Sequence, residues 1–177
     1  MWQINRVSRM AVSLKALVVE DNMHMRVLLR TLLRSIGISE ILEATNGDSA
    51  IQMLAETKVD LILTDLSMEP LDGIAFTRAV REAGTSINPY IPIIMVTGHT
   101  ERHRVEAARD AGVTEFVAKP LTAKNLFARI TEVVERPRAY VRCDDYFGPD
   151  RRRRANEQHQ GPWRREDDVD TIVVGGI

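Results

Sequence analysis

Cysteine, long apolar runs and a net charge are what this sequence most clearly lacks. Cys143 is the one cysteine in 177 residues, so an internal disulfide and a Cys-x-x-Cys zinc site are excluded, and we expect a reducing, cytoplasmic location. No apolar run approaches the roughly 20 residues that cross a bilayer, and no segment near the start is typical of a secretory signal, so we expect no membrane insertion. The net charge of -1 excludes a uniformly basic surface for nucleic acid.

The small net charge hides two regions of different composition. Residues 1–135 carry 15 Lys and Arg against 17 Asp and Glu, whereas residues 136–165 carry nine Arg, no Lys and four acidic residues. A block of like charge is more typical of a tail than of a folded core. We therefore expect an N-terminal extension over 1–13, a folded domain over 14–135, and an irregular, flexible, arginine-rich tail over 136–177.

Within 14–135, short apolar runs alternate with segments of helical period. Near-continuous hydrophobicity over such short lengths is typical of strands buried on both faces of a parallel sheet. The clear runs are 16–19, 61–63 and 91–96, and two weaker ones are 41–44 and 114–117. The clearest helical period runs from Met25 to Ile36, with Gly37 at the position of a C-cap. Five repeats of strand and helix predict an α/β fold, in which helices cover both faces of a parallel sheet.

Polar residues interrupt the pattern where each of four predicted strands ends. Glu20 and Asp21 follow the first strand, Asp65 ends the third, Thr97 follows the fourth and Lys119 follows the fifth. Since the carboxyl ends of parallel strands form the ligand crevice of such sheets, we expect these side chains to converge. Converging carboxylates repel each other, and Mg²⁺, which prefers hard oxygen ligands, would relieve the repulsion. Each residue alone is more simply a cap or a surface residue, but together they predict a site for phosphoryl transfer.

The residues around these positions resemble the receiver domain of response regulators, the CheY-like family, over residues 14–135. The motifs that carry the resemblance are Val18-Val19-Glu20-Asp21-Asn22, Leu63-Thr64-Asp65-Leu66-Ser67-Met68, Asp72-Gly73, Met95-Val96-Thr97-Gly98 and Phe116-Val117-Ala118-Lys119-Pro120. The resemblance implies a flavodoxin-like (βα)5 fold with strand order 2-1-3-4-5. It also implies that Asp65 accepts a phosphoryl group from a histidine kinase or a phosphotransfer protein, with Lys119 pairing to a phosphoryl oxygen.

The same resemblance implies a metal site and a switch. The Mg²⁺ ligands that it implies are Glu20, Asp21, Asp65 and the backbone carbonyl of Ser67. Thr97 and Phe116 would form the switch, with the hydroxyl moving toward the phosphoryl group while the aromatic ring turns inward. Phe116 stands where the family commonly has tyrosine. The chemistry would be limited to self-phosphotransfer and autodephosphorylation, so we do not expect an enzyme that acts on a separate substrate.

The arginine-rich tail has no sustained period and is too short and polar for a second core, so we expect no output domain that binds specific DNA. All of its basic residues are arginine, which suits planar recognition of phosphates and guanine edges, and Tyr146, Phe147 and Trp163 are expected to stack on bases. The tail is similar to the extension of CheY-like effectors that bind cyclic di-GMP. The residues implied in that binding are Arg142, Tyr146, Asp150, Arg151, Arg152, Arg153, Trp163 and Arg164. A solvated tail, neutralised by its own acidic end, is the other interpretation.

The sequence thus predicts a stand-alone receiver that is phosphorylated on Asp65 and acts by protein–protein contact. Its output would be a motility component or a further phosphorelay protein. The alternative is an effector whose tail binds cyclic di-GMP and docks the receiver on a target.

Overall fold

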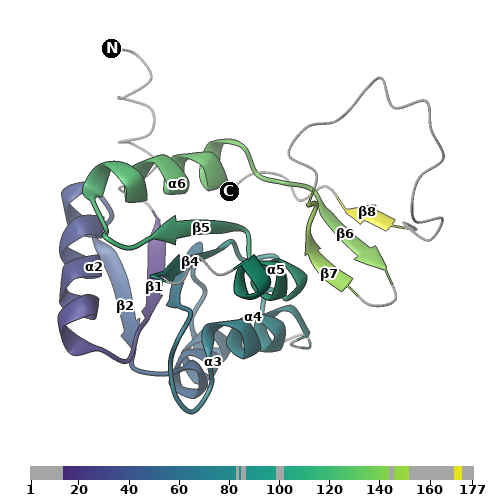
Figure 1. Ribbon diagram of the computed structural model, residues 1–177, viewed down its shortest axis with the longest axis horizontal. Helices are drawn as coiled ribbons and strands as arrows, with labels where there is room; N and C mark the ends of the chain where they lie inside the picture. The colour runs from purple at the N-terminus through teal and green to yellow at the C-terminus, as the bar shows by residue number, and fades with distance from the viewer. Residues whose placement is uncertain are drawn as a thin grey trace.

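A central parallel sheet organises the chain (Figure 1). The computed structural model describes residues 14–82, 84, 87–98, 102–143, 146–151 and 170–172. The strands of the sheet are β1 (Lys15–Val19), β2 (Glu40–Ala44), β3 (Leu61–Asp65), β4 (Ile93–Thr97) and β5 (Glu115–Ala118). They lie in the order β2-β1-β3-β4-β5, and each neighbouring pair is parallel. The predicted fold class and strand order are confirmed.

Helices connect the strands and cover both faces of the sheet. They are α2 (Met23–Ser35), α3 (Gly47–Glu56), α4 (Gly73–Glu82), α5 (Arg102–Asp110) and α6 (Ala123–Glu135). Figure 1 shows α2 and α6 on one side of the sheet, away from α3 and α4. The side chain of Asn22 accepts hydrogen bonds from two backbone amides at the start of α2, and Gly37, at a φ of 101°, follows its end as predicted. None of the helices in the described part of the chain is long and apolar enough to cross a membrane.

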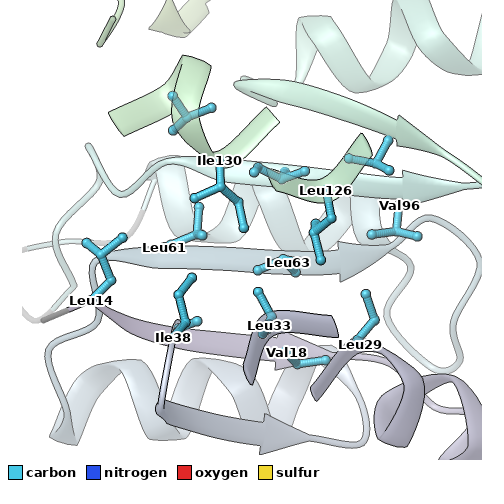
Figure 2. Close-up of a cluster of buried hydrophobic side chains, with 14 of the residues drawn as sticks. Leu14, Val18, Leu29, Leu33, Ile38, Leu61, Leu63, Val96, Leu126 and Ile130 are labelled. Carbon is cyan, nitrogen blue, oxygen red and sulfur yellow. The ribbon is translucent and has the colours of Figure 1, made fainter. Parts of the chain in front are cut away.

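Two hydrophobic layers fix the helices to the sheet. Because side chains alternate along a strand, β1 and β3 each send residues to both layers. Figure 2 shows one layer, where Val18 and Leu63 of the sheet meet Leu29 and Leu33 of α2 and Leu126 of α6. The other layer joins Leu17 and Ile62 to residues of α3 and α4. This packing holds the carboxyl ends of the strands in register at one edge.

The chain beyond α6 contains a feature that the sequence analysis did not predict. Strands β6 (Tyr140–Cys143) and β7 (Tyr146–Pro149) pair as an antiparallel hairpin, and β8 (Asp170–Ile172) pairs with the other edge of β6. We call β6 and β7 together the C-terminal hairpin. The expectation of irregular structure is therefore wrong for these residues, which form regular strands. Two four-residue strands are too short to show an alternating pattern, and their stability comes from packing against the rest of the fold.

Gly73, the first residue of α4, lies directly against the backbone that carries Asp65. A Cβ atom at this position would lie 2.1 Å from the carbonyl oxygen of Asp65 and 3.1 Å from the Cα of Leu66. The amide of Gly73 also donates a hydrogen bond of 3.0 Å to the Leu66 carbonyl. Only a residue without a side chain lets the helix start this close to the end of β3.

We expect the substitution Gly73→Ala to lower the free energy of unfolding by about 2 kcal/mol, because the backbone of β3 and α4 must separate to admit the methyl group. Urea unfolding followed by circular dichroism measures the change. Gly84→Ala is the matched control, since a Cβ there meets nothing within 4 Å. Equal midpoints for the two variants would contradict the close contact described here.

Candidate functional site

The four predicted strand ends meet at the carboxyl edge of the sheet. Glu20 follows β1, Asp65 is the last residue of β3, Thr97 is the last residue of β4, and Lys119 follows β5. The amide of Lys119 donates to the carbonyl of Thr97 at 2.9 Å, which joins the ends of β4 and β5. Glu20, Asp65 and Thr97 are all buried.

A lysine ammonium group lies between two acidic side chains. The Nζ of Lys119 is 2.7 Å from Oδ1 of Asp65 and 3.8 Å from Oε2 of Glu20. The other carboxylate oxygen of Asp65 accepts a hydrogen bond of 3.1 Å from the amide of Ser67. The predicted convergence of Glu20, Asp65 and Lys119 is therefore confirmed.

Glu20 carries the clearest sign that this crevice is short of positive charge. Its side chain is 2% exposed, and Oε2 accepts no hydrogen bond within the described part of the chain. Burial and, next, the charge of Asp65 raise the pKa of Glu20 from 4.5 to about 7, although a hydrogen bond from the amide of Asn22 and the charge of Lys119 act in the opposite direction. A further cation in the crevice would stabilise the ionised form of Glu20.

The predicted magnesium ligands are only partly assembled. In the described part of the chain, no group of three or more His, Cys, Asp or Glu side chains is placed to hold a metal ion by itself. Oδ1 of Asp65 pairs with the ammonium of Lys119, and Oδ2 accepts the amide of Ser67. The chemistry of the donors nevertheless fits Mg²⁺: a buried carboxylate oxygen with no donor, a second buried carboxylate, the neighbouring Asp21 and the backbone near Ser67 offer hard oxygen atoms.

Two arginines that the sequence analysis missed contact this crevice. The Nη1 of Arg26, on α2, donates to the carbonyl oxygens of Glu20 and Asp21 at 2.8 and 2.9 Å and so fixes the loop after β1. The Nη1 of Arg104, on α5, lies 3.5 Å from Oγ of Ser67. Arg26 could have been found from the sequence, because its spacing from Asn22 places it in the first turn of α2, next to the loop after β1. Nothing in the sequence indicates that Arg104 reaches across to Ser67.

The two predicted switch residues lie on neighbouring strands. In the register of β4 and β5, Thr97 is opposite Ala118 and Met95 is opposite Phe116. The Phe116 ring is half-buried and packs beside Met95. Phe116 also lines a cavity of about 470 Å³ that is bordered by α5 and the C-terminal hairpin. Their coupling during signalling stays a prediction.

The described residues that were predicted to bind a nucleotide make contacts within the fold. Tyr146 is buried, and its hydroxyl donates to the carbonyl of Pro149 at 2.8 Å; its stacking on a base stays a prediction. Phe147 packs against Tyr90, with ring centroids 5.3 Å apart, and Arg142 lies 4.5 Å over the Phe147 ring. The amide of Asp150 donates to the carbonyl of Ala139, and Arg151 pairs with Asp110 at 2.9 Å. Arg152, Arg153, Trp163 and Arg164 lie outside the described residues.

The fold and the crevice together define a class: a flavodoxin-like α/β protein with an acidic pocket at the carboxyl edge of its sheet. Residues 16–131 match the family of response regulator receiver domains, so the chain belongs to that family, and two-component signalling is the process in which it acts. The chemotaxis protein CheY of Pseudomonas aeruginosa is 37% identical over 123 residues, which are 70% of this chain and 98% of that protein. CheY-3 of Vibrio cholerae is 32% identical over 124 residues, 70% of this chain and 94% of that protein.

Solved structures agree with this assignment. The structure of CheY4 of Vibrio cholerae superposes with a TM-score of 0.63 at 27% identity, covering 68% of this chain and 98% of that one. The receiver domain of the sensor histidine kinase PA1611 of Pseudomonas aeruginosa superposes with a TM-score of 0.59 at 28% identity, covering 67% of this chain and 94% of that one. That structure is described with a magnesium ion coordinated in its active-site cleft.

The raised pKa of Glu20 predicts a pH dependence of stability in the metal-free protein. Between pH 4.5 and about 7 the unfolded chain has lost this proton while the folded protein keeps it, so the free energy of unfolding falls as the pH rises through this window. The loss amounts to about 3 kcal/mol and is complete above pH 7. We expect Glu20→Gln, which mimics the protonated side chain, to be more stable than the parent at pH 8 and nearly equal to it at pH 4.5.

Urea unfolding in EDTA at the two pH values measures this difference. The contributions of the other acidic groups to the pH dependence cancel in the comparison, because both proteins carry those groups. Glu56→Gln, at the exposed end of α3, is the control and should follow the parent at both pH values. A constant difference between Glu20→Gln and the parent across the window would show that Glu20 titrates normally.

Proposed function

We propose that this protein is a phosphoacceptor response regulator, in which Asp65 takes a phosphoryl group from a phosphohistidine. The observation that carries the proposal is the pairing of Asp65 with Lys119 at 2.7 Å beside the buried Glu20. A carboxylate held at the end of a strand, with a cation on one side and a backbone amide on the other, is a positioned nucleophile. The receiver-domain family of the chain supports this role.

The reaction forms one bond and breaks one. A carboxylate oxygen of Asp65 attacks the phosphorus, the phosphorus–nitrogen bond of the donor breaks, and the imidazole nitrogen keeps the electron pair. Lys119 is placed to pair with an oxygen of the incoming group, because its ammonium already contacts Asp65. Mg²⁺, bound by Glu20, Asp21, Asp65 and the Ser67 carbonyl, would supply positive charge against the phosphoryl oxygens. Apart from this transfer and the later hydrolysis of the acyl phosphate to carboxylate and inorganic phosphate, we propose no enzymatic activity.

A protein donor and a protein target both suit the surface around the crevice. The exposed side chains of Met23, Val27 and Leu28 lie on α2, whose first residue is two positions after Asp21. An apolar patch beside a charged pocket is a natural contact for a histidine kinase or a phosphotransfer protein. The similarity to chemotaxis proteins supports an output by protein–protein contact in motility. The location that we propose is the cytoplasm.

Asp65→Asn is expected to abolish phosphoryl uptake from acetyl phosphate and Mg²⁺, since an amide is a poor nucleophile for this transfer. Intact-mass spectrometry measures the uptake, and loss of the label in hydroxylamine distinguishes an acyl phosphate on Asp65 from a phosphate on the neighbouring Ser67. Asp72→Asn is the matched control, because Asp72 caps α4 by accepting the amide of Ala75 at 2.7 Å and should leave uptake unchanged. Undiminished uptake in Asp65→Asn, or uptake in excess EDTA, would overturn the proposal.

One observation favours the second candidate function, in which cyclic di-GMP is an effector. The cavity of about 470 Å³ is lined by Arg109, Arg138 and Arg151, which come from α5 and from both sides of the hairpin. Guanidinium groups are suited to phosphates and guanine edges, and the volume falls in the range of small-molecule sites. Of the described residues that the sequence analysis predicted to bind cyclic di-GMP, Tyr146 and Arg151 line this cavity.

If this candidate is correct, calorimetry with cyclic di-GMP will show saturable heat with the full chain. Arg151→Gln should then weaken binding at least tenfold, because one of the three cavity arginines loses its charge. Arg136→Gln, whose side chain is largely exposed and pairs only with Glu132 of α6 among the described residues, should bind like the parent. Absence of heat with the full chain would remove this function.

A further inference from the structure

The C-terminal hairpin docks on the edge of the fold where β5 begins. The rings of Tyr140 and Phe147 lie 5.2 and 5.3 Å from the ring of Tyr90, and the hydroxyl of Tyr140 donates to the carbonyl of Tyr90 at 2.9 Å. At Gly148, a Cβ atom would come within 2.9 Å of the Cα of Gly112, so the two backbones nearly touch. The hairpin is therefore part of the packed fold and covers the end of α5.

A buried charge lies under this cover. Arg81, at the end of α4, is 4% exposed and donates to the carbonyls of Pro89, Ile91 and Gly112. The ring of Tyr140 closes the site, 5.3 Å from the guanidinium carbon. Burial lowers the pKa of Arg81, which records the cost of keeping its charge from water. If the hairpin lifted, Arg81 would recover hydration, and this gain would offset part of the lost aromatic contact.

Two ion pairs tie the hairpin to the elements beside it. Arg138, just before β6, lies 3.3 Å from Glu115, and Arg151, just after β7, lies 2.9 Å from Asp110 at the end of α5. Glu115 is the first residue of β5 and is buried. The ion pair of Arg138 therefore joins the hairpin to β5, the strand that ends beside the crevice.

Strand β5 connects the hairpin to the phosphoacceptor. Its four residues span roughly 13 Å. At one end Glu115 pairs with Arg138 and Phe116 lines the cavity below the hairpin; directly beyond the other end, Lys119 contacts Asp65. As the edge strand of the sheet, β5 is hydrogen-bonded on one side to β4, so within the described sheet it has one neighbour to resist a shift.

We propose that the C-terminal hairpin is a reversible cover over α5 and the start of β5, and that phosphorylation of Asp65 weakens its docking. This inference rests on the function proposed for Asp65. A phosphoryl group on Asp65 moves negative charge outward, and the ammonium of Lys119 follows it. Because Lys119 continues directly from β5, the strand is drawn toward the crevice, and Glu115 is drawn away from Arg138. The lifted hairpin uncovers Tyr90 and Arg81.

Hydrogen–deuterium exchange of the full chain tests the proposal. The protein is treated with acetyl phosphate and Mg²⁺, and intact mass establishes that the phosphoryl group is present before exchange begins. We expect amides of residues 140–149 to exchange at least fivefold faster in the phosphorylated protein, in the range of ordinary coupling between sites. Asp65→Asn under the same conditions should show no acceleration.

A reciprocal variant checks the direction of the coupling. Arg138→Gln removes the ion pair to Glu115, so the hairpin should exchange faster without phosphorylation. Because this contact no longer has to break when Asp65 is phosphorylated, we expect the steady-state level of phosphorylation of Asp65 to rise. Arg136→Gln makes the same charge change two residues earlier, on an arginine paired with Glu132 of α6, and should match the parent in both measurements.

The outcomes separate this inference from the function on which it rests. If the intact mass shows no phosphoryl uptake, the proposed function of Asp65 fails. If uptake is complete and residues 140–149 exchange at the same rate or more slowly, the cover is not controlled by Asp65. Faster exchange in Arg138→Gln with unchanged phosphorylation would likewise overturn the coupling.

Discussion

The ammonium group of Lys119 and the two buried acidic side chains beside it form the contact on which the rest of the crevice depends. Glu20, Asp65 and Lys119 come from three separate strand ends, and each pays a desolvation cost that the charges of the others help to offset. The close start of α4 at Gly73 and the fixed loop after β1 serve the same purpose, because they hold the carboxylates where the ammonium reaches them. The excess of acidic groups that remains would favour a cation at this edge.

The sheet was predictable because strands buried on both faces have an almost continuous apolar sequence. Its helices were predictable from caps and period, as at Gly37, which takes a positive φ at the end of α2. The C-terminal hairpin was not predictable on these grounds. Tyr140 and Tyr146 look like exposed aromatic residues in an arginine-rich segment, and their burial depends on Arg81 and Tyr90, which lie more than 45 residues earlier in the sequence. Such long-range packing leaves no local signal.

For the site, the positions of Glu20, Asp65 and Lys119 at the ends of predicted strands were enough to predict that they lie together, because the carboxyl ends of parallel strands share one edge. These positions did not indicate which carboxylate oxygen Lys119 pairs with, nor that Oε2 of Glu20 accepts no hydrogen bond from the described residues. These details depend on side-chain direction and burial. Arg104 shows the same limit, since its approach to Ser67 crosses from one helix to a loop 37 residues away.

The contact between Tyr140 and Arg81 also determines how this receiver can be recombined with other proteins. A module cut after Glu135 would keep every residue of the crevice, but it would expose a guanidinium whose three nitrogens all donate to carbonyls, and a Tyr90 ring without its two aromatic neighbours. Such a fragment would carry a new apolar patch and a tendency to self-associate. The unit that can be transplanted intact into another chain therefore extends at least through Arg151.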